Sequence, residues 1–163
     1  KTLLDMSELQ TVSRDETIAV DALVDEVLVD LEPLAQEKKI KLIGNCKDTT
    51  MVGSDILIYR MVYNLVENAI KYNHFGGQVT VTAYRKGKNI CLSVEDTGSG
   101  IPAELKERIF EPFFRVDKSR SRQLGGVGLG LALVREIVRV HDGRIIVQSS
   151  PSGGTIFEVV FTQ

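Results

Sequence analysis

Hydrophobic residues recur at helical spacing in four stretches of the chain. In residues 54–72 six apolar side chains fall on one broad arc, and Ser54 stands where it can cap the first turn. The six are Ile58, Met61, Val62, Leu65, Val66 and Ala69. The same spacing predicts a helix over residues 21–34, capped by Asp21, and another over residues 129–140, with Gly143 as its C-cap. Residues 1–10 repeat less regularly and predict the tail of a further helix.

Alternating or continuous apolar runs predict strands between these helices. The longest cover residues 79–84, 90–94, 144–149 and 155–162, and the first two form a hairpin around Lys86-Gly87-Lys88. Shorter strands are expected at residues 40–43 and 50–52, around a polar turn at Gly44-Asn45, with a short helix at residues 104–110. The pattern predicts a two-layer α/β sandwich, a mixed sheet with helices on one face.

Composition narrows the class of protein. The 163 residues are 43% hydrophobic, enough for one principal domain. A net charge of -2 gives no broad basic surface for nucleic acid, and a local cluster of basic residues reads as a solvated loop: Arg115, Lys118, Arg120 and Arg122. Cys46 and Cys91 stand far apart and form neither a metal motif nor a disulfide framework, which favours a reducing compartment. No apolar run reaches the roughly 18 to 20 residues that span a bilayer.

One helix carries a polar face opposite its apolar arc. Asn64, Asn68 and Lys71 share this face, which is either an ordinary solvated surface or a ligand-binding one. Two glycine-rich segments, residues 96–101 and 125–131, follow it in the chain. Glycine lets backbone approach a ligand closely, amides at a helix start attract phosphate, and carboxamides hold a hydrated cation. The ordered set predicts a nucleotide pocket.

Two commoner nucleotide signatures are excluded. Gly87-Lys88 is followed by Asn89, so the chain has no GxxxxGK[ST] loop. Leu131 stands where the last glycine of a dinucleotide fingerprint would be, and the segment follows a polar loop rather than a strand.

The remaining pattern resembles the ATP-binding catalytic domain of sensor histidine kinases, in the superfamily of gyrase, heat-shock chaperone and mismatch-repair ATPases. Its motifs occur in order: an asparagine box at 64–72, a glycine box at 96–101, a phenylalanine box at 110–115, a second glycine box at 126–131, and Gly153-Gly154-Thr155. The resemblance covers residues 17–163 and implies the Bergerat fold with a lid over residues 102–126. Residues 1–16 would then end a dimerisation and phosphoacceptor helix.

The resemblance implies ATP as the ligand and assigns the adenine end of the pocket. Asp96 would accept a hydrogen bond from the exocyclic amine of adenine, where guanine presents an oxygen. Gly98 and Gly100 would let the backbone pass close to the base, and Ile101 would form an apolar wall. Thr155 closes the last motif, although a strand threonine is usually structural.

The resemblance also assigns the phosphate end. Asn68 would ligate Mg²⁺ and Asn64 would assist it, while Lys71 and Tyr72 would contact phosphate. Arg115 would reach the terminal phosphate, so Lys71 and Arg115 are the catalytic candidates. The second glycine box would bring amides to the phosphates through Gly126, Gly128, Leu129 and Gly130.

One position bears on the reaction. Gyrase-like ATPases carry a base glutamate where this chain has Asn64, and an amide cannot take the proton; Glu67 projects about 100° away from Asn68. The resemblance therefore favours transfer of the γ-phosphoryl group to a histidine over hydrolysis. Neither His74 nor His141 lies in an acceptor motif, so that histidine is expected upstream, on a helical hairpin of the dimer.

The expected partners are this hairpin and a response regulator, with the chain as a cytoplasmic domain of a membrane-anchored sensor. Two alternatives stay open. One is a serine kinase or hydrolysing ATPase on the same fold. The other is a nucleotide-binding module that signals without transferring phosphate.

Overall fold

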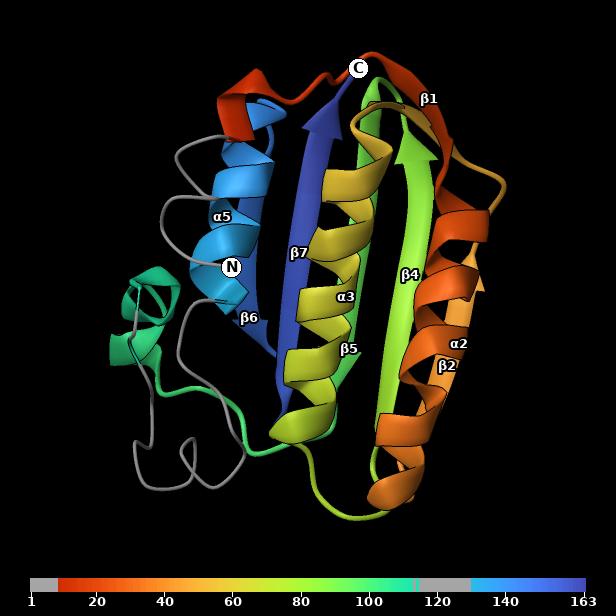
Figure 1. Cartoon of the computed structure of the whole chain (residues 1–163). Coiled ribbons are helices and arrows are strands. Elements are labelled where there is room, and N and C mark those ends of the chain that lie inside the picture. Colours follow the sequence, from red (N-terminus) through yellow and green to blue (C-terminus); the bar gives the residue numbers. More distant parts are fainter. Residues whose placement is uncertain (1–8, 113, 115–129) are drawn as a thin grey trace.

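Three helices cover one face of a five-stranded sheet in the computed structural model, which describes residues 9–112, 114 and 130–163 (Figure 1). The strand order is β2 (Lys41–Cys46), β4 (Gln78–Lys86), β5 (Asn89–Asp96), β7 (Thr155–Thr162), β6 (Arg144–Ser149). Only the β2–β4 pair is parallel. The helices are α2 (Val20–Glu37), α3 (Asp55–Lys71) and α5 (Gly130–Val140). The predicted α/β sandwich with a mixed sheet is confirmed.

A second, two-stranded sheet lies outside the sequence prediction. It pairs β1 (Glu16–Ala19) with β3 (Thr50–Gly53), and β1 was not predicted. The expected turn at Gly44-Asn45 is wrong, because β2 runs through both residues in register with β4 and the parallel ladder outweighs the local turn signal. Short 3-10 helices occupy Leu9–Thr11, Ala103–Leu105 and Arg108–Phe110. The predicted helix tail at residues 1–8 lies outside the described residues.

Two helix boundaries differ from the sequence prediction. Asp21 is not the N-cap of α2: the helix starts at Val20, whose amide donates to the backbone oxygen of Thr49. At the end of α5, Asp142 adopts the left-handed conformation (φ 57°) that was expected at Gly143. The amide of Gly143 still closes the helix on Val138 O, as in a Schellman motif. Glycine is required at 143 because an added Cβ would lie 2.7 Å from the Phe161 ring.

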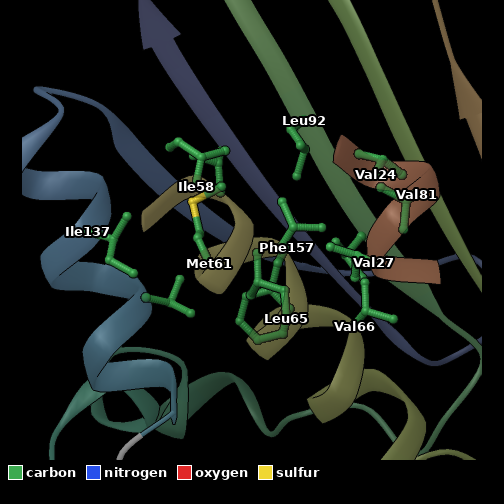
Figure 2. Packing of buried hydrophobic residues seen from close by; sticks show 14 of the residues in the cluster. Val24, Val27, Ile58, Met61, Leu65, Val66, Val81, Leu92, Ile137 and Phe157 are labelled. Atoms are coloured by element: carbon green, nitrogen blue, oxygen red, sulfur yellow. The ribbon is translucent and has the colours of Figure 1, made fainter. Parts of the chain in front are cut away.

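The core lies between the helices and the sheet. The apolar arc of α3 is fully buried, as its periodicity predicted, and packs between α2 and α5 (Figure 2). Ser54 caps α3 as expected, accepting from the Leu57 amide at 3.3 Å. The polar face of α3, opposite this arc, stays partly exposed. Among the described residues, no helix combines the length and apolarity needed to cross a membrane.

His141 joins the end of α5 to the start of α3. Its Nε2 accepts from the Ser54 amide at 3.0 Å, so the neutral ring carries its proton on Nδ1, which donates to Ile137 O at 2.8 Å. The ring packs edge-on against Phe161. Gly53 lies so close that an added Cβ would be 2.8 Å from Cδ2 of His141. His141 therefore has a structural role between the two helices.

We expect the free energy of unfolding to fall as the pH drops below about 6.5 through His141. Burial lowers the pKa of His141 from 6.5, and the charge of Arg14 acts in the same direction, against the Ile137 hydrogen bond and Asp142. The unfolded chain therefore binds the proton at a higher pH than the folded chain, so stability is lost as the pH falls from the unfolded value toward the folded one.

Urea unfolding of the wild-type protein and His141→Gln between about pH 7.5 and 5.5 measures this effect. The variant should be less stable at high pH, and the gap should narrow as the pH falls. A gap that stays constant with pH would show that His141 does not titrate in this range.

Candidate nucleotide-binding site

The C-terminal half of α3 presents amide and ammonium groups on its half-exposed face. The side chains of Asn64 and Asn68 find no hydrogen-bond partner among residues 9–112, 114 and 130–163. Lys71 pairs weakly with Glu67, its Nζ lying 3.9 Å from Glu67 Oε2. The sequence placed these groups together correctly. Their oxygens and the ammonium remain available to a hydrated cation and to anionic groups.

The last turn of α3 is held by the ammonium group of a second lysine. Lys38, the C-cap residue of α2, donates from Nζ to the carbonyl oxygens of Ile70 (3.2 Å) and Lys71 (2.9 Å). Tyr72 is the C-cap residue of α3, and its amide donates to Asn68 O at 3.2 Å. Positive charge is favourable at a helix C-terminus, and here it fixes the end of the helix that bears Asn68 and Lys71.

Asp96 is a buried carboxylate at the end of β5, with 7% of its surface exposed. Its Oδ1 accepts from the amides of Gly98 (2.8 Å) and Thr155 (3.3 Å). In the part of the chain that the structure describes, no group donates to Oδ2. Burial raises the pKa of Asp96 above its ordinary value, while the two amides oppose this change. The carboxylate is therefore oriented through Oδ1.

Glycine is required by tight packing around this carboxylate. A Cβ added at Gly154 would lie 2.0 Å from the backbone oxygen of Asp96, and one at Gly98 would lie 2.5 Å from Tyr72 O. Gly100 has φ +77°, and an added Cβ would lie 2.6 Å from Gly153 O. These glycines let the end of β5, the end of α3 and the β6–β7 turn pack directly on one another.

Sequence reasoning missed three polar residues that join these segments. Asn73 and Thr97 hydrogen-bond each other at 3.1 Å, and the Ser150 hydroxyl accepts from the Gly154 amide at 3.0 Å. Asn73 directly follows the asparagine box, Thr97 lies within the first glycine box, and Ser150 stands three residues before Gly153. Nearness to these motifs was the available signal, but only the fold shows which bonds these side chains make.

The other predicted site residues divide into two groups. Ile101 packs partly buried against the core, Thr155 contributes its backbone amide to Asp96, and Gly130 is the first residue of α5. Four candidates lie outside the described residues: Arg115, Gly126, Gly128 and Leu129.

Comparison with known proteins places this arrangement in a family. Residues 53–163 match the family described as "Histidine kinase-, DNA gyrase B-, and HSP90-like ATPase". The chain belongs to this ATPase family. Membership implies that the domain binds ATP.

Relatives within the ATPase family are sensor kinases. The chain is 39% identical over 159 residues to the sensor-like histidine kinase SenX3 of Mycobacterium tuberculosis, covering 95% of this chain and 39% of SenX3. The catalytic domain of histidine kinase ThkA, in a nucleotide-free form, superposes with TM-score 0.82 at 27% identity, covering 92% of this chain and 96% of that domain.

A complex of ThkA with the response regulator protein TrrA gives TM-score 0.76 at 26% identity, covering 91% of this chain and 41% of the ThkA chain. This chain thus spans about two fifths of the length of its curated relative SenX3.

We expect Gly154→Ala to lower the free energy of unfolding by about 1–3 kcal/mol, because its Cβ would overlap the backbone of Asp96. Gly130→Ala is the matched control. Among the described residues nothing lies within 4 Å of its added Cβ, and alanine favours the helix, so its stability should be unchanged or slightly higher. Urea unfolding measures both, and equal stability of the two variants would contradict the packing at Gly154.

Proposed function

We propose that this chain binds Mg-ATP and donates its γ-phosphoryl group to a histidine of an upstream dimerisation domain, as the kinase module of a two-component sensor. The observation that carries the proposal is the combination, within an ATPase-family fold, of Asp96 and the carboxamides of α3. Among the residues that the structure describes, one oxygen of Asp96 and both carboxamides have no hydrogen-bond partner. Residues 1–16 would belong to the end of the phosphoacceptor hairpin and residues 17–163 to the catalytic domain.

Asp96 reads the base in this proposal. Its Oδ2 accepts a hydrogen bond from the adenine amine, while Oδ1 stays held by Gly98 and Thr155. Burial makes this bond strong and makes a mismatched oxygen costly, so guanine is rejected. Ile101 supplies an apolar wall for the base.

The donor set of α3 fits Mg²⁺. Neutral carboxamide oxygens are ligands that magnesium accepts alongside water and phosphate, and those of Asn68 and Asn64 are uncommitted among the described residues. Bound Mg²⁺ would supply charge neutralisation at the phosphates. Lys71 and Arg115 add positive charge there, Tyr72 adds a hydroxyl, and Gly126, Gly128, Leu129 and Gly130 offer amides at the start of α5.

The chemistry of position 64 favours transfer over hydrolysis. The amide of Asn64 has no basic lone pair with which to activate water. Glu67 does not replace it, because position 67 projects about 100° away from Asn68 around the helix. The terminal P–O bond of ATP would instead break as an imidazole nitrogen bonds to phosphorus. ADP leaves, and the imidazole proton passes to solvent.

The acceptor and the next partner lie outside this chain in our proposal. His141 is committed to bonds with Ser54 and Ile137, and His74 is an exposed turn residue. The ThkA–TrrA complex supports a response regulator as the receiver of the phosphoryl group. We place the domain on the cytoplasmic side of a membrane-anchored sensor, without a role in nucleic-acid binding.

Asn68→Ala should weaken Mg-dependent ADP binding about tenfold or more, which corresponds to about 1.4 kcal/mol. The side chain is half-exposed and without partners among the described residues, so the unfolding midpoint should barely move. Calorimetric titration with ADP, with and without Mg²⁺, measures the effect. Gln36→Ala, on an exposed face of α2, is the control. Unchanged affinity would refute the metal assignment.

The full-length protein containing this chain should form an acid-labile phosphohistidine upstream of residue 1 when given Mg-ATP. Radiolabelled γ-phosphate and acid and base stability of the label measure this. Three other outcomes would overturn the proposal in favour of an alternative. Label on a serine of a partner indicates a serine kinase, release of free phosphate alone indicates a hydrolysing ATPase, and binding without turnover indicates a signalling module.

A further inference from the structure

Asn73 lies at the junction between α3 and the sheet, and its side chain is almost completely buried, with 1% of the residue exposed. Its Nδ2 donates to Gln78 O at 3.1 Å at the start of β4. Its Oδ1 accepts from the His74 amide at 2.7 Å and from the Thr97 hydroxyl at 3.1 Å. One carboxamide therefore ties the loop after α3 to the ends of two strands.

Thr97 carries this link to the base-reading carboxylate. It stands between Asp96 and Gly98, and its Oγ1 accepts from the Gln78 amide at 3.0 Å while donating to Asn73. The Thr97 amide also donates to Gln78 O, at 3.3 Å. The turn that offers the Gly98 amide to Asp96 Oδ1 is thus fixed on both sides.

Glycine backbone packs closely against these two side chains. An added Cβ at Gly77 would lie 2.3 Å from Asn73 Oδ1 and 2.7 Å from Thr97 Oγ1. An added Cβ at Gly98 would lie 3.1 Å from the Cα of Asn73. Asn73 is buried and Thr97 is partly exposed, so backbone packs on the pair from the side of Gly77 and Gly98.

We propose that Asn73 and Thr97 form a positioning pair that holds the base-reading carboxylate of Asp96 in fixed register with the phosphate-binding end of α3. The proposal rests on the proposed nucleotide function. Lys71 and Asn73 stand on either side of the C-cap residue Tyr72, so the segment that ends the phosphate-binding face also bonds the turn after Asp96. The pair thereby fixes the spacing between the base and phosphate subsites.

This role predicts effects on selectivity as well as affinity. If the turn after Asp96 loosens, the Gly98 amide no longer holds Oδ1, and Oδ2 loses its fixed direction toward the adenine amine. The preference for ADP, whose base needs this acceptor, over GDP, whose base does not, then becomes smaller. A residue that merely supports the fold would change the unfolding midpoint without changing the preference between bases.

The test measures binding of ADP and GDP to this chain by calorimetry, together with urea unfolding. Thr97→Val removes the hydroxyl while keeping the shape of the side chain, and Thr97→Ser keeps the hydroxyl. Asn73→Ala and the double variant complete a cycle, and Asp96→Asn is the benchmark for lost base selection. Ile90→Val, a buried change at the opposite end of β5, controls for destabilisation alone.

Thr97→Val should weaken ADP binding roughly 3- to 10-fold and lower the ADP-to-GDP preference in the direction of Asp96→Asn. Thr97→Ser should retain both the ADP affinity and the base preference. The double variant should lose less ADP affinity than the sum of the losses in Asn73→Ala and Thr97→Val. If Asn73→Ala fails to fold, the comparison of Thr97→Val with Thr97→Ser still tests the proposal.

Several outcomes would overturn the positioning role: a Thr97→Ser loss equal to that of Thr97→Val, additive effects in the cycle, or an unchanged base preference. An Ile90→Val loss as large as that of Thr97→Val would do the same. Absence of ADP binding in the wild-type chain would instead overturn the proposed function on which the pair depends.

Discussion

The packing of α3 against the sheet is the constraint on which the rest of the site depends. The helix lies between α2 and α5 and buries its whole apolar arc, so its rotation about its own axis is fixed. That fixed rotation turns Asn64, Asn68 and Lys71 away from the core together. These polar groups therefore need no separate scaffold, because the hydrophobic effect that folds the domain also orients them.

A second constraint acts at the end of this helix. Three chain segments converge there: the loop after α3, the end of β5 and the turn between β6 and β7. They approach so closely that glycine is required at several points, and their polar groups are satisfied mainly by one another. Asp96 stands at the centre of this junction. Its burial is costly, and its two amide donors offset part of that cost while orienting the carboxylate through Oδ1.

Much of this architecture was predictable from the sequence. The period of apolar residues found α3 and the four long strands, and the spacing of asparagines found the polar face. Local signals failed where a distant partner decided the outcome: β2 continues through Gly44-Asn45 because β4 pairs with it, and α2 begins at Val20 because Thr49 accepts its amide. β1 escaped detection because four residues carry too little periodicity, and it forms only by pairing with β3.

The candidate site shows the same division. Asp96 and its glycines stood out because their types and order are unusual, whereas Asn73, Thr97 and Ser150 are common turn residues whose bonds appear only in three dimensions. Arg115, Gly126, Gly128 and Leu129 remain predictions. Sequence motifs thus indicated the groups that would meet a ligand, but not those that hold them in place.

The contact between Gly53 and His141 has a consequence for how related sequences diverge. The imidazole ring occupies the space that any side chain at position 53 would need, and it accepts a hydrogen bond from the Ser54 amide at the start of α3. A larger residue at 53 is therefore compatible only with a smaller one at 141, which must then leave that amide to another acceptor. Replacement of Gly53 in a homologue should therefore be accompanied by a change at position 141, whereas a smaller residue at 141 is compatible with Gly53.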